Sequence, residues 1–298
     1  MPNLSRWILY PILFVVGLFA IAIAMVVVVL TLTYPNLPSL EVLTDYRPKI
    51  PLRVFTVDGQ MIGEFGEERR EIIRFPDVPG VMKQAILAAE DERFYQHGGV
   101  DAQGILRAAV SNFLGGSRRQ GASTITQQVA KNFFLSSEKT YVRKLYEALL
   151  SFKIERNLSK DQIFELYINQ IFLGQRAYGF GAAAQIYFGK SHKELTIAEA
   201  AMLAGLPKAP SAFNPVVNPK RARLRQQYVL RRMHELGFIN AEQHDAATKQ
   251  ALVVKRETNV FPVHAEYVAE MARQIAADRF PDDVYSAGLK VLDRKSVV

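Results

Sequence analysis

Three carboxylates stand in a row at the end of an apolar run, in the segment AAEDERFYQHGGVD (residues 88–101). This much charge at the end of an apolar helix fits the edge of an active site. The same residues also fit an ordinary helix that ends in solvent before Gly98 and Gly99, although carboxylates are unfavourable at that end of a helix. This segment alone leaves both interpretations open.

Uncharged hydrogen-bonding side chains are concentrated in residues 120–135, QGASTITQQVAKNFFL. At helical spacing one face carries hydroxyl, amide and ammonium groups, from Thr124, Gln128, Lys131 and Asn132. This face suits a polyhydroxylated, anionic ligand. A surface helix more often carries Glu–Lys pairs, but a polar outer face is the alternative interpretation.

A third polar pair lies in YVRKLYEALLSFKIERNL (residues 141–158), where Arg143 and Glu147 are four positions apart. The apolar pattern predicts a buried stripe of four residues, Val142, Leu145, Tyr146 and Leu149. Arg143 and Glu147 then lie together on another face. Taken alone, they fit a surface ion pair worth a few tenths of a kcal/mol, about 0.3–0.5.

The N-terminal segment is the strongest global signal, because no charged residue occurs from Trp7 to Tyr34. A run of this length exceeds the roughly 20 apolar residues that cross a bilayer. It is also longer than the apolar core of a cleaved signal peptide. We therefore expect a membrane anchor with a cytoplasmic N-terminus, since Arg6 precedes the run. A buried core helix is the alternative.

Composition limits the partners of the chain. The 298 residues carry a net charge of +8, which favours anionic partners such as lipid headgroups, phosphates or nucleic acid. The chain has no cysteine, and this excludes disulfides and thiolate metal sites.

The remaining pattern predicts a mostly helical domain on a short stalk. Residues 52–65 alternate around Asp58 and Gly59, which predicts a β-hairpin. Capping boxes begin two helices, at Ser159 and at Thr196. Residues 218–236 predict an amphipathic helix with its arginines on the exposed side, ended by Gly237.

Taken together, five segments resemble the successive motifs of the peptidoglycan glycosyltransferases (family 51). They are AAEDERFYQHGGVD, GASTITQQVAKN, RKLYEALLSFKIERNLSKDQIFELYINQIFLGQ, AYGFGAAAQIYFGK and EAAMLAGLPKAPSAFNPVVNP. The likeness runs from Pro76 to Arg232, and the stalk and the tail PVHAEYVAEMARQ resemble those of class A penicillin-binding proteins. It implies a mostly α, lysozyme-like glycosyltransferase domain with one N-terminal transmembrane helix and a short β-containing stalk.

With this resemblance, the expected organisation has five parts. They are a cytoplasmic tail (1–6), a transmembrane anchor (7–34), a stalk with a β-hairpin (35–75), the glycosyltransferase domain (76–250), and the truncated start of a following linker or domain (251–298).

The resemblance implies polymerisation of lipid II, a disaccharide-pentapeptide on a lipid pyrophosphate, into glycan strands with inversion at the donor anomeric carbon. Glu90 matches the general base and Glu147 the second catalytic glutamate. The matching cations, which we expect around the Glu147 end of a shared groove to hold the pyrophosphate, are Lys131, Arg143, Lys144 and Lys208. The other matching substrate-binding residues are Asp91, Phe94, His97, Thr124, Gln128, Asn132, Gln175 and Arg176. For His97 a structural hydrogen bond is favoured over proton transfer.

The resemblance also bears on cofactors, partners and location. A divalent cation (Mg or Mn) on the substrate pyrophosphate is compatible with it, while no residue cluster in the sequence requires a metal and no organic cofactor is expected. The expected partners are lipid II, the growing glycan chain, membrane lipid and cell-wall synthesis proteins, but no nucleic acid. The expected location is the bacterial cytoplasmic membrane, crossed once, with the catalytic domain outside the cytoplasm.

Class A proteins also carry a transpeptidase domain, which this chain does not resemble. Its one Ser-x-x-Lys candidate, Ser136 to Lys139, lies among the glycosyltransferase motifs, and no Lys-Thr-Gly follows. We therefore expect no transpeptidase activity and interpret the chain as truncated or a fragment. Two alternatives are a lytic glycosidase on the same fold and a non-catalytic membrane scaffold.

Overall fold

The computed structural model describes residues 3–46, 48–114, 123–135, 140–255 and 265–293. Within these ranges the side chains of residues 3–9, 22, 26, 29–30, 44, 111–114 and 141 are not described. The Ser136–Lys139 segment lies outside the described residues. Most of the described chain is helical, which confirms the predicted class.

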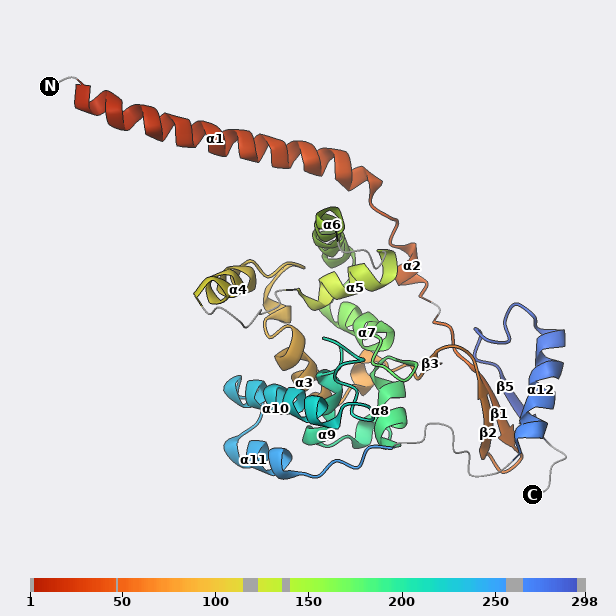
Figure 1. Ribbon diagram of the computed structural model, residues 1–298. Helices are drawn as coiled ribbons and strands as arrows, with labels where there is room; N and C mark the ends of the chain where they lie inside the picture. The colour runs from red at the N-terminus through yellow and green to blue at the C-terminus, as the bar shows by residue number, and fades with distance from the viewer. Residues whose placement is uncertain (1–2, 47, 115–122, 136–139, 256–264, 294–298) are drawn as a thin grey trace.

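The elements are labelled in Figure 1. The helices are α1 (Asn3–Thr33), α2 (Glu41–Thr44), α3 (Gly80–Glu90), α4 (Ala102–Leu114), α5 (Ile125–Phe134), α6 (Tyr141–Asn157), α7 (Lys160–Gln170), α8 (Phe180–Phe188), α9 (Ile197–Ala204), α10 (Pro219–Glu235), α11 (Ala241–Lys249) and α12 (Glu266–Arg279). The strands are β1 (Leu52–Thr56), β2 (Met61–Phe65), β3 (Arg69–Arg70), β4 (Ala177–Tyr178) and β5 (Lys290–Asp293).

A helical lobe holds the larger of two apolar cores. Helix α3 packs against α9 and α10, and α5 packs against α6 and α7. Among the largest fully buried side chains of this core are Tyr167, Tyr187, Phe164 and Phe180. Glu90 lies on α3 and Glu147 lies on α6. Because α3 packs against α10 and α5 packs against α6, both glutamates belong to helices of this one core.

The helix boundaries follow from local chemistry. Ser159 and Thr196 form the predicted capping boxes of α7 and α9, which satisfy backbone N–H groups that a helix start leaves free. Helix α10 ends just before Gly237, whose φ of +71° favours glycine. These three predictions are confirmed.

A smaller unit surrounds the second core. Strands β1 and β2 form the antiparallel hairpin predicted around Gly59, and β5 adds a parallel strand on the other side of β1. Helix α12 covers this sheet through Ala269 and Ala276 (Figure 1). The sequence predicts the stalk (35–75) and the C-terminal segment (251–298) as separate parts. In the structure, strand β5 of the C-terminal segment completes the sheet of the stalk.

Helix α3 ends earlier than the apolar pattern indicates. Its last residue is Glu90, and Asp91 leaves the helical conformation, with φ of −160° and ψ of 81°. The carboxylate of Asp91 accepts a hydrogen bond from the backbone N–H of Ile125, the first residue of α5. The turn therefore comes from Asp91 and its binding to α5, well before Gly98 and Gly99.

The predicted anchor is one continuous helix, α1, which extends away from the lobe (Figure 1). Over the residues that the structure describes, however, no helix has the length and apolarity needed to cross a membrane. The transmembrane helix at residues 7–34 is thus not confirmed.

Candidate active site

Glu90 lies at the C-terminal end of α3 with a side chain only 11% exposed. Its two carboxylate oxygens differ. Oε2 accepts a hydrogen bond of 2.8 Å from the side-chain amide of Gln128, on α5. Oε1 is buried and has no hydrogen-bond partner among the described residues. One oxygen is therefore held by the protein, while the other is free to accept a proton.

The surroundings of Glu90 raise its pKa above that of an exposed glutamate. Burial raises the pKa of Glu90, and the Gln128 hydrogen bond together with the charges of Arg225 and Lys208 acts in the opposite direction. The Arg225 guanidinium is 3.8 Å from Oε1. A carboxyl group whose pKa is raised but which has cations nearby can be ionised at neutral pH and still act as a base.

Glu147, on α6, is buried at 3% exposure and pairs with two cations. Arg143 donates to Oε1, and the Lys144 ammonium donates to Oε2 over 2.7 Å. The simple surface ion pair is thus the wrong interpretation, because the carboxylate is in the interior. Val142, predicted to be buried, is instead 64% exposed. The helix is rotated so that Glu147, rather than Val142, faces inward.

Lys131, on α5, connects the two glutamates electrostatically. Burial and the charge of Arg143 lower the pKa of Lys131, whereas the charge of Glu90 raises it. Burial and the charges of Arg143 and Lys131 also lower the pKa of Lys144, even though its ammonium is close to Glu147. Lys131, Arg143 and Lys144 are thus close enough to repel one another, so that positive charge is concentrated between the two glutamates. An anion bound there would relieve this repulsion.

Lys208 lies in a different place from the other three cations. It is exposed, and its charge acts on the carboxyl group of Glu90. The expectation that all four cations surround the Glu147 end is therefore wrong for Lys208. The reason is topological: Lys208 follows α9, and α9 packs against α3, which carries Glu90.

Asp91 and His97 support the site from behind. The Asp91 carboxylate is 7% exposed and is used by two donors, the backbone N–H of Ile125 at 3.0 Å and the His97 ring nitrogen Nε2 at 3.0 Å. A carboxylate at the first N–H groups of α5 is favourable because that end of a helix is positive. Both residues thus fix the start of α5 to the end of α3, which is the structural role favoured for His97.

Two predicted substrate-binding residues are corrected by their burial. Phe94 is 0% exposed and packs in the core against Phe164. Thr124 is 2% exposed; its hydroxyl caps α5 and donates to the carbonyl oxygen of Gly99 over 2.6 Å. Neither side chain is available to a ligand, because apolar packing occupies the ring and backbone groups occupy the hydroxyl.

Three further predicted residues have neighbours other than Glu90 and Glu147 in the part of the chain that the structure describes. Asn132 lines a hollow beside α2, with Tyr46 and Gln170. Gln175 and Arg176 form a turn with φ values of 50° and 60°, in which Arg176 donates to the carbonyl oxygen of Glu67. Helical spacing placed Asn132 with Lys131, but adjacent residues of a helix point in directions about 100° apart.

Sequence reasoning missed Arg225. Arg225 was assigned to the exposed side of α10, yet it is 9% exposed, stacks on Tyr228 at 4.5 Å and lies beside Glu90. It belongs to the buried stripe of that helix, Ala222, Arg225, Gln226, Val229, Leu230 and Met233. An arginine at a position of the apolar stripe was the signal available.

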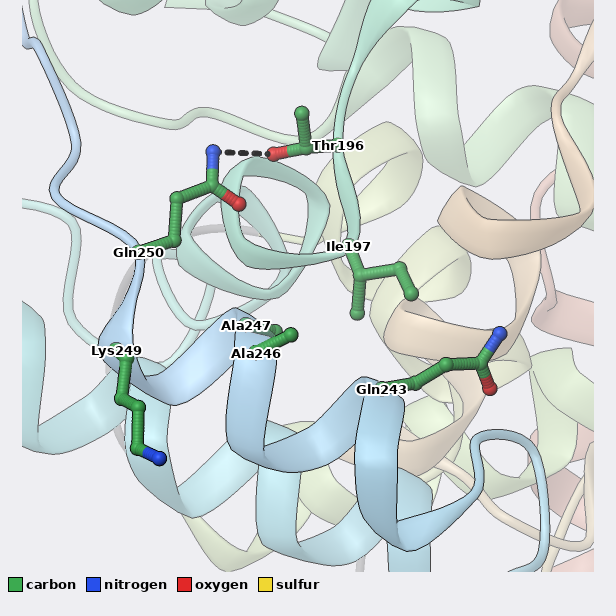
Figure 2. Close-up of a pocket in the computed structure, with 7 residues that line it drawn as sticks. All are labelled: Thr196, Ile197, Gln243, Ala246, Ala247, Lys249 and Gln250. Carbon is green, nitrogen blue, oxygen red and sulfur yellow. Dashed lines mark hydrogen bonds between the residues drawn. The ribbon is translucent and has the colours of Figure 1, made fainter.

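Neither a group of metal ligands nor a second hollow involves the predicted site residues in the described part of the chain. Within the described ranges, no group of three or more His, Cys, Asp or Glu side chains is placed to hold a metal ion. A hollow between the start of α9 and α11 contains none of the predicted residues (Figure 2). It is lined by Thr196, Ile197, Gln243, Ala246, Ala247, Lys249 and Gln250.

The family is decided by a match over most of the lobe. The transglycosylase family model matches residues 58–234, which contain both glutamates and all four cations. The chain belongs to the transglycosylase family. The match includes the hairpin strand β2 and nearly all of α10, so that this transglycosylase region extends to Arg225.

Curated relatives extend the likeness beyond that region. The chain is 56% identical over 277 residues to penicillin-binding protein 1A of Neisseria lactamica, covering 93% of this chain and 35% of that protein. It is 48% identical to penicillin-binding protein 1A of Pseudomonas aeruginosa, covering 87% and 31%. A crystal structure of penicillin-binding protein 1A from Haemophilus influenzae is 34% identical, covers 82% of this chain and 27% of that one, and has a TM-score of 0.48. The chain thus spans about a third of the length of the relatives it matches.

Proposed function

We propose that the chain is a peptidoglycan glycosyltransferase that polymerises lipid II into glycan strands, with inversion at the donor anomeric carbon, and that the helical lobe is the lysozyme-like domain expected for it. One observation carries the proposal. A buried carboxylate with a free oxygen, on Glu90, is linked through Lys131 to a cluster of positive charge. A base beside an anion-binding cluster fits transfer of a sugar from a pyrophosphate.

In this mechanism Glu90 is the general base. The 4-hydroxyl of the acceptor sugar gives its proton to Oε1, and the hydroxyl oxygen forms a bond to the anomeric carbon of the donor. The bond from that carbon to the pyrophosphate oxygen breaks, and the electron pair leaves with the pyrophosphate. Attack on the face opposite the leaving group inverts the α-linked donor to a β-linked product. The raised pKa of Glu90 supports this role because it makes the carboxylate a stronger base.

The cations then stabilise the leaving group. The pyrophosphate gains negative charge as the bond breaks, and donors already in place lower the barrier. Arg143 is well suited, because its Nε is buried without a hydrogen-bond partner in the described part of the chain while another nitrogen binds Glu147. Guanidinium groups bind phosphate oxygens strongly and directionally.

Glu147 serves this step by position rather than by proton transfer. Both of its oxygens are already used, Oε1 by Arg143 and Oε2 by Lys144. We infer that it fixes the two cations that meet the pyrophosphate, and that its distance from Glu90 exceeds the roughly 5–5.5 Å of a retaining carboxylate pair.

A divalent cation would be held by the substrate rather than by the chain. The part of the chain that the structure describes has no group of three or more His, Cys, Asp or Glu side chains placed to hold a metal ion, and both oxygens of Glu147 are occupied. Bound to the pyrophosphate oxygens, Mg²⁺ or Mn²⁺ would neutralise part of their charge. The chain itself supplies proton transfer at Glu90 and charge stabilisation at Lys131, Arg143 and Lys144.

We further propose that the enzyme works at the outer face of the bacterial cytoplasmic membrane, held at the bilayer by α1. The described apolar side chains of α1 are exposed, with Phe14 at 66% and Phe19 at 68%. A lipid-linked donor stays in the bilayer plane, so an enzyme held there meets it by two-dimensional diffusion. Lipid II, the growing glycan chain and membrane lipid are the proposed partners, and cell-wall synthesis proteins are further candidates.

A lytic glycosidase is the second candidate function. It needs an acid that protonates the leaving oxygen, and the buried Glu90 could serve. A sugar leaving group, however, has no use for the charge of Lys131, Arg143 and Lys144. A scaffold without activity would have no use for a base whose free oxygen is buried.

The test is polymerisation of lipid II by the purified full chain, followed by gel separation of the products, beside release of soluble fragments from isolated peptidoglycan. We expect the parent to make long glycan strands and to release no soluble fragments from peptidoglycan. Glu90→Gln should make no glycan strands. Release of fragments by the parent without polymerisation would replace the proposal by the glycosidase, and inactivity in both assays would favour the scaffold.

A further inference from the structure

Tyr167 carries a buried polar group that the mechanism above does not use. It lies near the end of α7 and is 1% exposed, with its ring 6.4 Å from that of Phe180. Its hydroxyl has no hydrogen-bond partner among the described residues. Buried hydroxyl groups are nearly always hydrogen-bonded, because leaving one unpaired costs about 1–3 kcal/mol. This hydroxyl therefore calls for a partner close by.

Helix α7 passes the segment that follows α3, because the ring of Phe164, three residues before Tyr167, lies 6.2 Å from that of Phe94, four residues after Glu90. Burial and the negative charges of Glu90 and Asp91 raise the pKa of Tyr167, while Arg225 lowers it. Arg225 has no acceptor atom. The oxygens of Asp91 are already bound by His97 and by the backbone N–H of Ile125. Of these two carboxylates, only Glu90 has an oxygen, Oε1, that is buried without any hydrogen bond among the described residues.

We propose that the Tyr167 hydroxyl donates a hydrogen bond, directly or through one water, to Oε1 of Glu90 in the working site and so positions the base for the acceptor sugar. The inference rests on the proposed function of Glu90. Gln128 holds Oε2 from α5, and Tyr167 orients the other oxygen from α7. Tyr167 is a positioning residue, since it acts through Glu90 and not on the substrate.

The proposal predicts the direction of a pH effect. A hydrogen bond donated to a carboxylate stabilises its ionised form and lowers its pKa. The other groups that face Glu90 are Gln128 and Lys131 on α5, Arg225 on α10, Lys208 after α9, and Asp91. Helix α9 contributes only Glu199, whose carboxylate is bound by Lys190 and by its own helix start. None of these groups changes in Tyr167→Phe, so a shift in that variant belongs to the hydroxyl.

Two measurements test the inference. In Tyr167→Phe the pKa of Glu90, followed by carbon-13 NMR of labelled glutamate and assigned with Glu90→Gln, should rise by about one unit. The acidic limb of the kcat profile for lipid II polymerisation should move up by the same amount. On that limb kcat should fall about tenfold with KM within twofold, and it should recover at alkaline pH. A loss that is equal at every pH, or an unchanged Glu90 pKa, would overturn the proposal.

Tyr187→Phe is the matched control. Tyr187 is also fully buried in the lobe, and its hydroxyl donates 2.8 Å to the carbonyl oxygen of Leu173. Its removal should leave the Glu90 pKa unchanged. If Tyr167→Phe does not fold, 3-fluorotyrosine at position 167 keeps the hydroxyl as a stronger donor, and the Glu90 pKa should then fall; no fall would refute the inference.

The two proposals can fail separately. A parent chain that does not polymerise lipid II would overturn the function and, with it, the positioning role for this reaction. A parent that polymerises, with a Glu90 pKa that is the same in Tyr167→Phe, would leave the function standing and remove Tyr167 from it.

Discussion

The Arg225 guanidinium lies 3.8 Å from Oε1 of Glu90, and both side chains are about nine-tenths buried. Arg225 cannot easily move away, because it stacks on Tyr228 and its Nε donates to the carbonyl oxygen of Gly205 over 3.4 Å. A fixed positive charge next to a buried carboxylate keeps that carboxylate ionised against the cost of its burial. The helix after the last motif therefore takes part in setting the state of the base.

The first prediction concerns this pair. Arg225→Met removes the charge and keeps an apolar side chain against Tyr228, so the Glu90 pKa should rise further. Since the base must be ionised to accept a proton, the acidic limb of the activity profile should move to higher pH by about one unit. Arg225→Lys keeps the charge and should restore most of the shift. The measurement is the pH dependence of lipid II polymerisation.

Arg231→Met is the control for that experiment. Arg231 lies on the same helix and also faces the Tyr228 ring, at 5.7 Å, but it pairs with Glu235 and its side chain is 60% exposed. Its removal should leave the profile in place. A limb that stays fixed in Arg225→Met would show that Arg225 is not the counter-ion of the base.

The second prediction concerns turnover. Glu90→Gln keeps the size of the side chain and removes the base, which should lower kcat by about 10²–10⁴. Binding of lipid II should be largely kept, because the cations are unchanged. Activity within threefold of the parent, measured with equal amounts of folded protein, would take Glu90 out of the catalytic role.

The third prediction concerns stability and uses the same variant. Burial raises the Glu90 pKa above the ordinary value of 4.5, so the folded state keeps this proton at a pH where the unfolded chain has lost it. The free energy of unfolding of the parent, relative to Glu90→Gln, should therefore be greatest below pH 4.5 and fall as pH rises through the folded pKa. Urea unfolding of both proteins from acid to neutral pH measures this. A difference that does not vary with pH would contradict the raised pKa.

The fourth prediction concerns the cation cluster. Lys131→Met removes one positive charge without breaking a buried ion pair, and turnover should fall on the order of 10²-fold if the lysine stabilises the leaving pyrophosphate. The loss should persist at high ionic strength, because a direct contact with the leaving group acts over less than a Debye length. Lys193→Met removes an exposed lysine paired with Asp77 and should have little effect. Equal turnover in the two variants would remove Lys131 from the site.

The fifth prediction concerns Thr124 as a structural residue. Thr124→Ala loses the cap of α5 and the bond to Gly99, which should lower the free energy of unfolding by about 1–2 kcal/mol. Thr124→Ser keeps the hydroxyl and should recover most of it. Turnover per folded molecule should stay within a few fold of the parent. A stable Thr124→Ala protein with turnover reduced a hundredfold would restore Thr124 as a substrate ligand.

Local features of this chain could be read from the sequence because their causes are local. The capping residues Ser159 and Thr196 act within three positions, and the hairpin at Gly59 depends on its own turn. Glu90 and Glu147 were found through whole motifs, since neither segment alone excluded an ordinary surface. Burial of Glu147 was missed because the apolar stripe of its helix was assigned without knowledge of the neighbouring α5.

The remaining features depend on contacts between distant segments. The apolar stripe of α10 can show that Arg225 turns inward, but not that it lies beside Glu90, 135 positions away. Phe94 stands among polar motif residues, yet packing against Phe164 makes it part of the core. The pairing of β5 with β1 is likewise a contact between segments on either side of the helical lobe in the sequence, and neither strand indicates its partner.

That pairing has a consequence for how the chain acquires its structure. Strand β1 is synthesised before β5, with the whole helical lobe between them. During synthesis the edge of β1 that pairs with β5 stays unpaired until more than two hundred further residues have been made. The small core of this sheet is likewise incomplete until α12 has been made. Such high contact order makes this sheet slow to close compared with the lobe, whose helices pack against near neighbours. The helical lobe can therefore fold first. Once it is packed, its first and last segments bring β5 close to β1.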